Sequence, residues 1–214
     1  CTALPARLGL VIIGNEGALV IGGLAAVVAG LQLGTGLPAA LSQMLMAIAA
    51  LVAGGLWIML AGALRHYRGV NETISSLLLN YVAIALINHL VEGPMRDAEF
   101  VTKPSSAELD ASLWIGNLPG SRIHYGLIYG LIACVIAYVL IQRTTFGFAA
   151  RTAGGNIRAA RIAGLPVGKL TLAVCFFGGS CAGLGGRVGV AGVAKRLKAS
   201  PGSYKGFGGN LLGL

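Results

Sequence analysis

Long apolar runs separated by short polar stretches set the pattern of this chain. Five of the runs approach the roughly 20 residues that a helix needs to cross about 30 Å of hydrocarbon. They cover about residues 8–30, 38–64, 71–91, 123–141 and 170–190. Runs of this length are typical of membrane-spanning helices. The pattern therefore predicts an all-α, polytopic transmembrane helical bundle, with residues 1–214 forming a single domain.

The first run is interrupted by the sequence Gly14-Asn15-Glu16-Gly17. A carboxylate such as that of Glu16 is costly within an apolar run and marks a functional position by default. Glycine on both sides, followed by Gly22-Gly23, suggests a broken helix of the kind that lines transporter sites. The alternative is that Glu16 lies at the membrane interface and caps a half-helix.

The third run carries two amides on one helical face. Asn71 can cap its first turn, and Asn80, Ile84 and Asn88 follow at spacings of four residues. Asn80 lies about 13 Å into the helix, close to the bilayer midplane. Amides at this depth must face protein or water, so they either join helices or contact a polar solute. Together with the first run, this gives four candidate solute-pathway residues: Asn15, Glu16, Asn80 and Asn88.

The composition supports a membrane protein. Charged residues make up only 11% of the chain, against about 25% in soluble domains. Glycine is abundant, at 34 of 214 residues, as expected where helices pack through small residues. The four cysteines lack metal-ligand spacing, so we predict neither a metal site nor a disulfide. The net charge of +9 is explained by membrane topology and anionic lipid, and we expect no nucleic-acid partner.

Acids and bases are separated along the chain. Residues 143–169 hold five bases and no acid, whereas residues 92–122 hold five of the seven acids. Because cytoplasmic loops carry an excess of Lys and Arg, we expect residues 143–169 and the cluster 65–68 in the cytoplasm and residues 92–122 outside. Arg187 and the bases from Lys195 onward, which follow the fifth run, disagree with this orientation. We place them outside because the three earlier segments agree with one another.

Residues 143–169 also contain a short helix with both ends marked. Asn156 is a good N-cap, Gly164 a good residue just beyond the end, and Arg158 and Arg161 share one face. Such a helix between two spans is a candidate docking element for a cytoplasmic partner; the alternative is a plain basic loop. The candidate coupling residues are Arg151, Asn156, Arg158, Arg161 and Gly164.

Three stretches resemble a known family. They are GNEG at residues 14–17, GVNETISSLLLNYVA at 69–83 and TTFGFAARTAGGNIRAARIAG at 144–164. They look like the permease subunit of bacterial ATP-binding-cassette (ABC) importers, in the nucleoside and simple-sugar branch that is related to ribose and branched-chain amino-acid permeases. The resemblance covers about residues 8–214 and lacks the family's first and last helices, so we expect a domain that is incomplete at both ends.

The resemblance implies a function and a set of partners. The chain would move a nucleoside or simple sugar inward across the bacterial cytoplasmic (inner) membrane, receiving it from an extracytoplasmic solute-binding protein. It would pair with a second permease subunit, identical or different. Residues 143–169 would form the cytoplasmic coupling segment that docks on a separate ATPase subunit.

The energy source distinguishes this reading from its alternatives. The phosphate-binding sequence GxxxxGK[ST] does not occur in these residues. We therefore expect ATP and Mg²⁺ on the partner ATPase, no cofactor in this chain, and no enzymatic activity of its own. The first alternative is an ion- or proton-coupled secondary transporter with Glu16 as the carrier. An intramembrane enzyme ranks below both, since the sequence offers no nucleophile–base pair.

Overall fold

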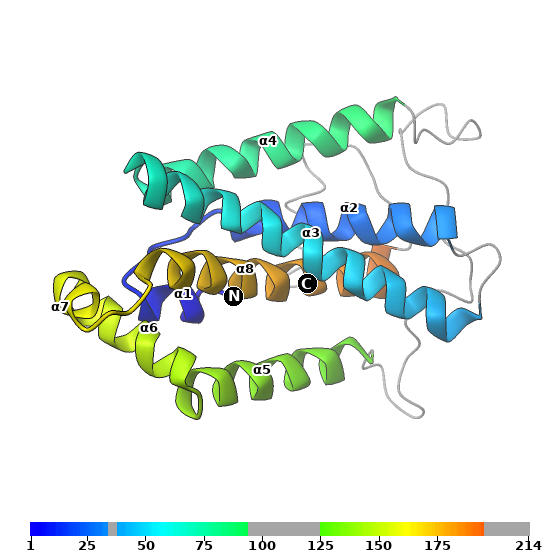
Figure 1. The fold of residues 1–214 in the computed structure, drawn as a ribbon. Helices are drawn as coiled ribbons and strands as arrows, with labels where there is room; N and C mark the ends of the chain where they lie inside the picture. The colour runs from blue at the N-terminus through cyan, green and yellow to red at the C-terminus, as the bar shows by residue number, and fades with distance from the viewer. Residues whose placement is uncertain (34–37, 94–124, 195–214) are drawn as a thin grey trace, which may run out of the picture.

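The structure is a computed structural model that describes residues 1–33, 38–93 and 125–194 (Figure 1). Within these ranges the regular elements are helices, which confirms the predicted fold class. They are α1 (Ala3–Arg7), α2 (Asn15–Leu33), α3 (Ala39–Arg68), α4 (Glu72–Glu92), α5 (Gly126–Gln142), α6 (Thr145–Gly155), α7 (Ile157–Ile162), α8 (Val167–Val188) and the π-helix η3 (Gly189–Ala194). By length and composition, four described helices could cross a membrane; α5 and α6, bent by 68°, would together make a fifth span.

The helix ends refine the predicted spans. Helix α2 begins at Asn15, and residues 8–14 before it are not helical, so the predicted span over residues 8–30 is wrong in its first part. Gly22-Gly23 lies inside α2, so the second predicted interruption is wrong as well. The Asn71 cap is confirmed, because its side chain accepts a hydrogen bond from the Thr73 N–H at 2.9 Å. Arg187 lies within α8 and is buried; it does not follow the span, as the sequence had suggested.

Helices α2, α3 and α8 form the centre of the bundle and approach one another through glycine. A Cβ on Gly54 of α3 would lie 2.8 Å from the Cα of Gly183 in α8. A Cβ on Gly22 of α2 would overlap the backbone of the same residue. The three backbones therefore meet around Gly183 without intervening side chains, which is the packing that the glycine content predicted.

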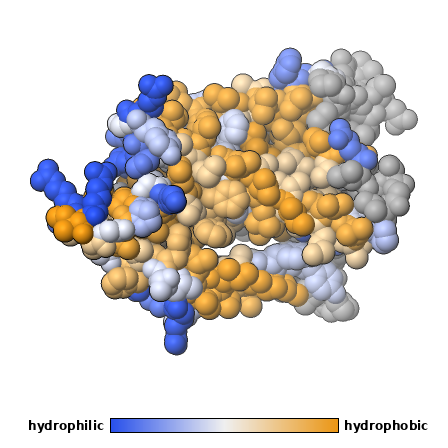
Figure 2. Space-filling view, in the orientation of Figure 1, coloured by the Kyte–Doolittle hydropathy of each residue, from blue (hydrophilic) through white to orange (hydrophobic). Residues whose placement is uncertain are grey.

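Helices α4 and α5 lie at the periphery. Helix α4 covers one side of α2 and α3, while α5 has no buried residue and runs along the other side (Figure 1). Figure 2 shows a broad apolar surface over the middle of the bundle, and the strongest concentration of hydrophilic residues at the end that carries α6 and α7. An exposed apolar belt of this kind fits contact with lipid.

The helix directions agree with the predicted sidedness. The end of α3, the start of α4, and α6 and α7 lie at one end of the bundle, and α4 and α8 end at the other (Figure 1). The basic clusters at residues 65–68 and 143–169 therefore share an end. Most of the acidic loop at 92–122, and the bases from Lys195 onward, lie outside the described residues.

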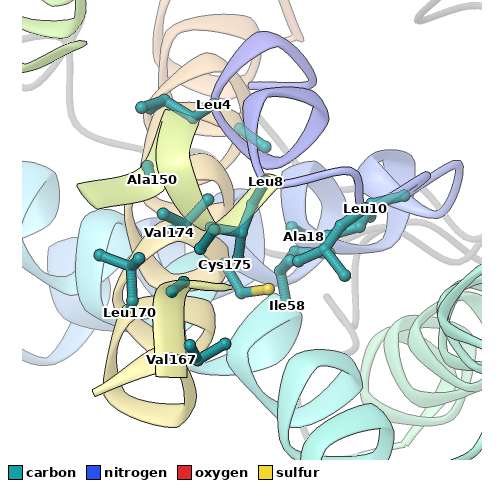
Figure 3. Packing of buried hydrophobic residues seen from close by; sticks show 14 residues of the cluster. Leu4, Leu8, Leu10, Ala18, Ile58, Ala150, Val167, Leu170, Val174 and Cys175 are labelled. Atoms are coloured by element: carbon teal, nitrogen blue, oxygen red, sulfur yellow. The ribbon is translucent and has the colours of Figure 1, made fainter. Parts of the chain in front are cut away.

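A non-helical stretch before α2 is built into the core. We call residues 8–14 the pre-α2 segment. Its side chains alternate: Leu8, Leu10 and Ile12 are buried, and the residues between them are exposed. Residues 8 and 9 form the turn that ends α1, with Gly9 at φ +74°, and the alternation over residues 10–13 is the pattern of an extended chain. Figure 3 shows Leu8 and Leu10 within the cluster formed with Val174 and Cys175 of α8 and with residues of α2, α3 and α6.

Candidate functional site

A small polar group lies inside the bundle where α2, α3 and α4 meet. Gly17, in the first turn of α2, makes room for it: a Cβ there would lie 3.0 Å from the Cα of Asn80 and 3.3 Å from the Nε1 of Trp57. The Asn80 Oδ1 and Trp57 Nε1 atoms are buried and have no hydrogen-bond partner. Leaving such an atom unpaired costs about 1–3 kcal/mol. Around Gly17, Asn80 and Trp57 therefore offer one acceptor and one donor that no other described protein group uses.

Asn15 lies at the same end of the α2–α4 interface. Its Nδ2 donates to the Ile12 carbonyl at 3.5 Å, and its buried Oδ1 has no partner. The neighbouring Gly14 contacts Ser76 of α4, because a Cβ on Gly14 would overlap the Ser76 carbonyl. Asn15 thus stands between Gly14, fixed to Ser76, and Gly17, packed against Asn80.

The other two predicted pathway residues lie apart from this group. Asn88 follows Asn80 by eight residues, about 12 Å along α4, and is half-buried with its Oδ1 unpaired. Glu16 is exposed on the outside of α2 and is not part of the buried group. The structure therefore brings Asn15 and Asn80 to one place and leaves Asn88 and Glu16 outside it.

Trp57 is a site residue that the sequence reasoning missed. Tryptophan usually lies at the ends of a span, where the indole N–H reaches the interface. Trp57 instead lies in the middle of the 30-residue helix α3, between the buried residues Gly55 and Ile58. That mid-span position was the available signal, since an indole N–H in an apolar environment needs a partner.

At the polar end of the bundle, Glu72 forms a part-buried ion pair with Arg65. The Glu72 side chain is 8% exposed and that of Arg65 is 40% exposed. Glu72 Oε1 also accepts a weak hydrogen bond from the Val11 N–H at 3.5 Å. The pair joins the end of α3 to the start of α4, and the Arg65 guanidinium neutralises the charge of the Glu72 carboxylate at this edge of the bundle.

The predicted short helix is present, and both of its predicted capping residues are confirmed. Asn156 Oδ1 accepts hydrogen bonds from the Arg158 and Ala159 N–H groups at 3.0 and 3.1 Å. Gly164 has φ +77°, and the Leu165 N–H donates to the Ala160 carbonyl at 3.0 Å. This is the glycine termination that the sequence predicted. The helix ends at Ile162, one residue earlier than expected.

The outward surface of α7 is both basic and apolar. Arg158 and Arg161 are exposed, and Ile162 is 88% exposed, whereas Ala160 is buried against the bundle. Arg151, on α6, is exposed and donates from Nη1 to Gln142 Oε1 at 3.0 Å, which links α6 to the end of α5. An exposed isoleucine beside two exposed arginines is a surface suited to a protein partner.

Comparison with known proteins gives three informative relatives. The glucose ABC transporter permease protein TsgB13 of Haloferax volcanii is 36% identical over 92% of this chain and 54% of its own length. The guanosine ABC transporter permease protein NupP of Bacillus subtilis is 33% identical over 96% of this chain and 59% of its own length. The nucleoside ABC transporter permease protein NupB of Lactococcus lactis is 28% identical over 87% and 53%. The chain thus spans little more than half the length of these relatives.

The family is shown by a match to a family model. No solved structure matches the chain significantly. A family model described as "branched-chain amino acid transport system / permease component" matches residues 3–202. This match confirms the resemblance drawn from the three sequence stretches, together with the all-α, multi-pass permease fold. The chain belongs to this family of ABC transporter permease components.

Proposed function

We propose that this chain is part of the permease subunit of an ATP-driven importer for a nucleoside or simple sugar. The observation that carries the proposal is the buried, unpaired polar group of Asn80 and Trp57 beside Gly17. Its groups are neutral, so they suit a neutral solute rich in hydroxyl groups. The indole ring can also stack on a sugar or base. The printed names of the relatives, which include glucose, guanosine and nucleoside permeases, support the same class.

The second part of the proposal concerns energy. Helix α7 is short, capped at both ends and exposed, as a docking element must be if it is to transmit force. We assign it to the ATPase subunit, which would bind ATP and Mg²⁺. An extracytoplasmic solute-binding protein and a second permease subunit complete the importer. The ion-coupled alternative is weaker because Glu16, its carrier, lies outside the buried polar group.

The test is uptake by the assembled importer in proteoliposomes, with radiolabelled guanosine and glucose as probes. Asn80→Leu and Trp57→Phe each remove one unpaired polar group, and uptake of the transported probe should fall about tenfold for a lost hydrogen bond in a dry site. His89→Leu is the matched control, since it is a polar-to-Leu change at an exposed position of the same helix. Its uptake should stay at the parent level.

Two outcomes would overturn the proposal. Unchanged uptake of both probes in Asn80→Leu and Trp57→Phe alike would place the solute pathway elsewhere. Uptake that needs no ATPase subunit and is abolished by a protonophore alone would establish the ion-coupled alternative instead.

A further inference from the structure

We infer that the pre-α2 segment, residues 8–14, is a mechanical link that carries movement of the docking helices α6 and α7 to helix α4 beside the buried polar group. The inference rests on the proposed function, because it assumes that α7 meets an ATPase. It assigns a role to residues that touch neither the solute nor the ATPase.

The first step is the contact between α6 and the start of the segment. Gly154 lies in the last turn of α6, and a Cβ there would overlap the carbonyl of Arg7 and lie 3.1 Å from the Cα of Leu8. Leu8 is buried in the same cluster as Ala150 and Ala153 of α6. The end of α6 thus rests directly on the backbone of the segment, with no side chain between them to absorb a displacement.

The second step is the shape of the segment. Residues 10–13 belong to no helix, and the alternating burial of Leu10 and Ile12 is that of an extended chain. An extended backbone rises about 3.3 Å per residue and is close to its maximum length. Residues 10–13 can therefore lengthen little under tension. The turn at residues 8 and 9, whose N–H groups donate to the Pro5 and Ala6 carbonyls, joins them to the point where α6 makes contact, so a pull there reaches α4.

The third step is the attachment of the segment to α4. The Thr73 Oγ1 donates to the Val11 carbonyl at 2.9 Å, and the Gly14 N–H donates to Ser76 Oγ at 3.3 Å. Glu72 adds the weak bond to the Val11 N–H. Three residues in the first turn and a half of α4 are thereby tied to the segment. Ser76 lies one helical turn before Asn80, so the attachment is next to the polar group.

The experiment uses the assembled importer with its native cysteines removed and one cysteine introduced by Ile84→Cys. Ile84 is half-buried, one turn from Asn80, and outside the polar group. The measurement is the rate at which a small thiol reagent modifies this cysteine, with the ATPase empty and with it trapped by ATP and vanadate. In the parent protein the two rates should differ.

Two link variants break the link from opposite ends, and each has a matched control. Thr73→Val with Ser76→Ala removes the hydroxyls bonded to the segment; its control, Ser75→Ala with Thr171→Val, removes hydroxyls bonded within their own helices. Gly154→Ala forces α6 off Arg7; its control is Gly155→Ala, where an added Cβ meets nothing within 4 Å.

Both link variants should retain the ATPase subunit. The nucleotide-dependent difference in rate should shrink about fivefold for each hydrogen bond lost in Thr73→Val with Ser76→Ala, and it should also shrink in Gly154→Ala, where the contact between α6 and Arg7 is displaced. Both controls should keep the nucleotide-dependent difference in rate. A difference that survives in both link variants, or that is lost equally in the controls, would overturn the link. A parent protein that binds no ATPase or shows no difference would instead reject the proposed function, and the link with it.

Discussion

At the residue scale, Arg187 is buried more completely than its chemistry favours. It is 1% exposed, its Nε and Nη2 have no hydrogen-bond partner, and its guanidinium lies 5.5 Å from the centre of the Tyr129 ring. A cation–π contact contributes about 0.5–2 kcal/mol, which is less than the cost of several kcal/mol for a buried unpaired charge. Arg187→Met, which keeps most of the volume, should therefore raise the Tm of the purified permease.

Thermal unfolding in detergent checks this expectation, and Arg151→Met is the control. Arg151 is exposed, so its replacement should leave the Tm nearly unchanged. A lower Tm for Arg187→Met would mean that the guanidinium is paired in the purified protein.

Gly164 is a second residue whose role follows from its backbone. Its φ of +77° is unfavourable for residues with a Cβ, although an added Cβ would meet nothing within 4 Å. Gly164→Val should thus destabilise the end of α7 by about 1–2 kcal/mol through backbone strain alone. Gly164→Asn should be tolerated, because Asn adopts this conformation readily. Co-purification of the ATPase should fall for the first variant only, and equal losses in both would contradict the explanation.

At the element scale, α7 should bind its partner through charge. Arg158→Glu with Arg161→Glu reverses two exposed charges on one face without touching the caps at Asn156 and Gly164. The ATPase subunit should then co-purify poorly, and solute-binding protein should no longer stimulate ATP hydrolysis. The matched control is Arg143→Glu with Lys169→Glu, an equal charge change at exposed positions outside α7. If the ATPase subunit associated fully with the first variant, residues 143–169 would be a basic loop without a docking role.

The elements differ in how far the sequence predicted them. The caps at Asn71, Asn156 and Gly164 were predictable because each acts within a few residues of itself. Helix α6 was missed, since its glycines resemble a loop until the packing of Gly154 against Arg7 is known.

For the site, too, the sequence predicted what depends on local rules and missed what depends on contacts between distant elements. Asn15 and Asn80 were named from local rules about polar groups in apolar runs, and both lie in the region where α2 meets α4. Their neighbour Trp57, the Arg65–Glu72 pair and the burial of Arg187 depend on contacts between different elements. Such contacts leave little trace in a single sequence.

At the scale of the whole molecule, the two ends of the bundle should lie on opposite sides of the membrane. Glu92 ends α4 and Gly155 ends α6, and both are exposed at opposite ends of the bundle (Figure 1). In a protein without its native cysteines, Glu92→Cys should react with an impermeant thiol reagent in intact cells. Gly155→Cys should react only after the membrane is opened. Reaction of both in intact cells would contradict the orientation.

The meeting of three backbones at Gly183 has a consequence for how such a bundle can change shape. Side chains between helices act as compliant spacers, since they can switch rotamers as one helix slides past another. Around Gly183 there are none, so α2, α3 and α8 must translate and rotate together as one rigid body. Any opening and closing of a passage then falls to α4 and α5, whose packing is looser. Glycine, which has no side chain, thus determines which helices are stationary and which are free to move.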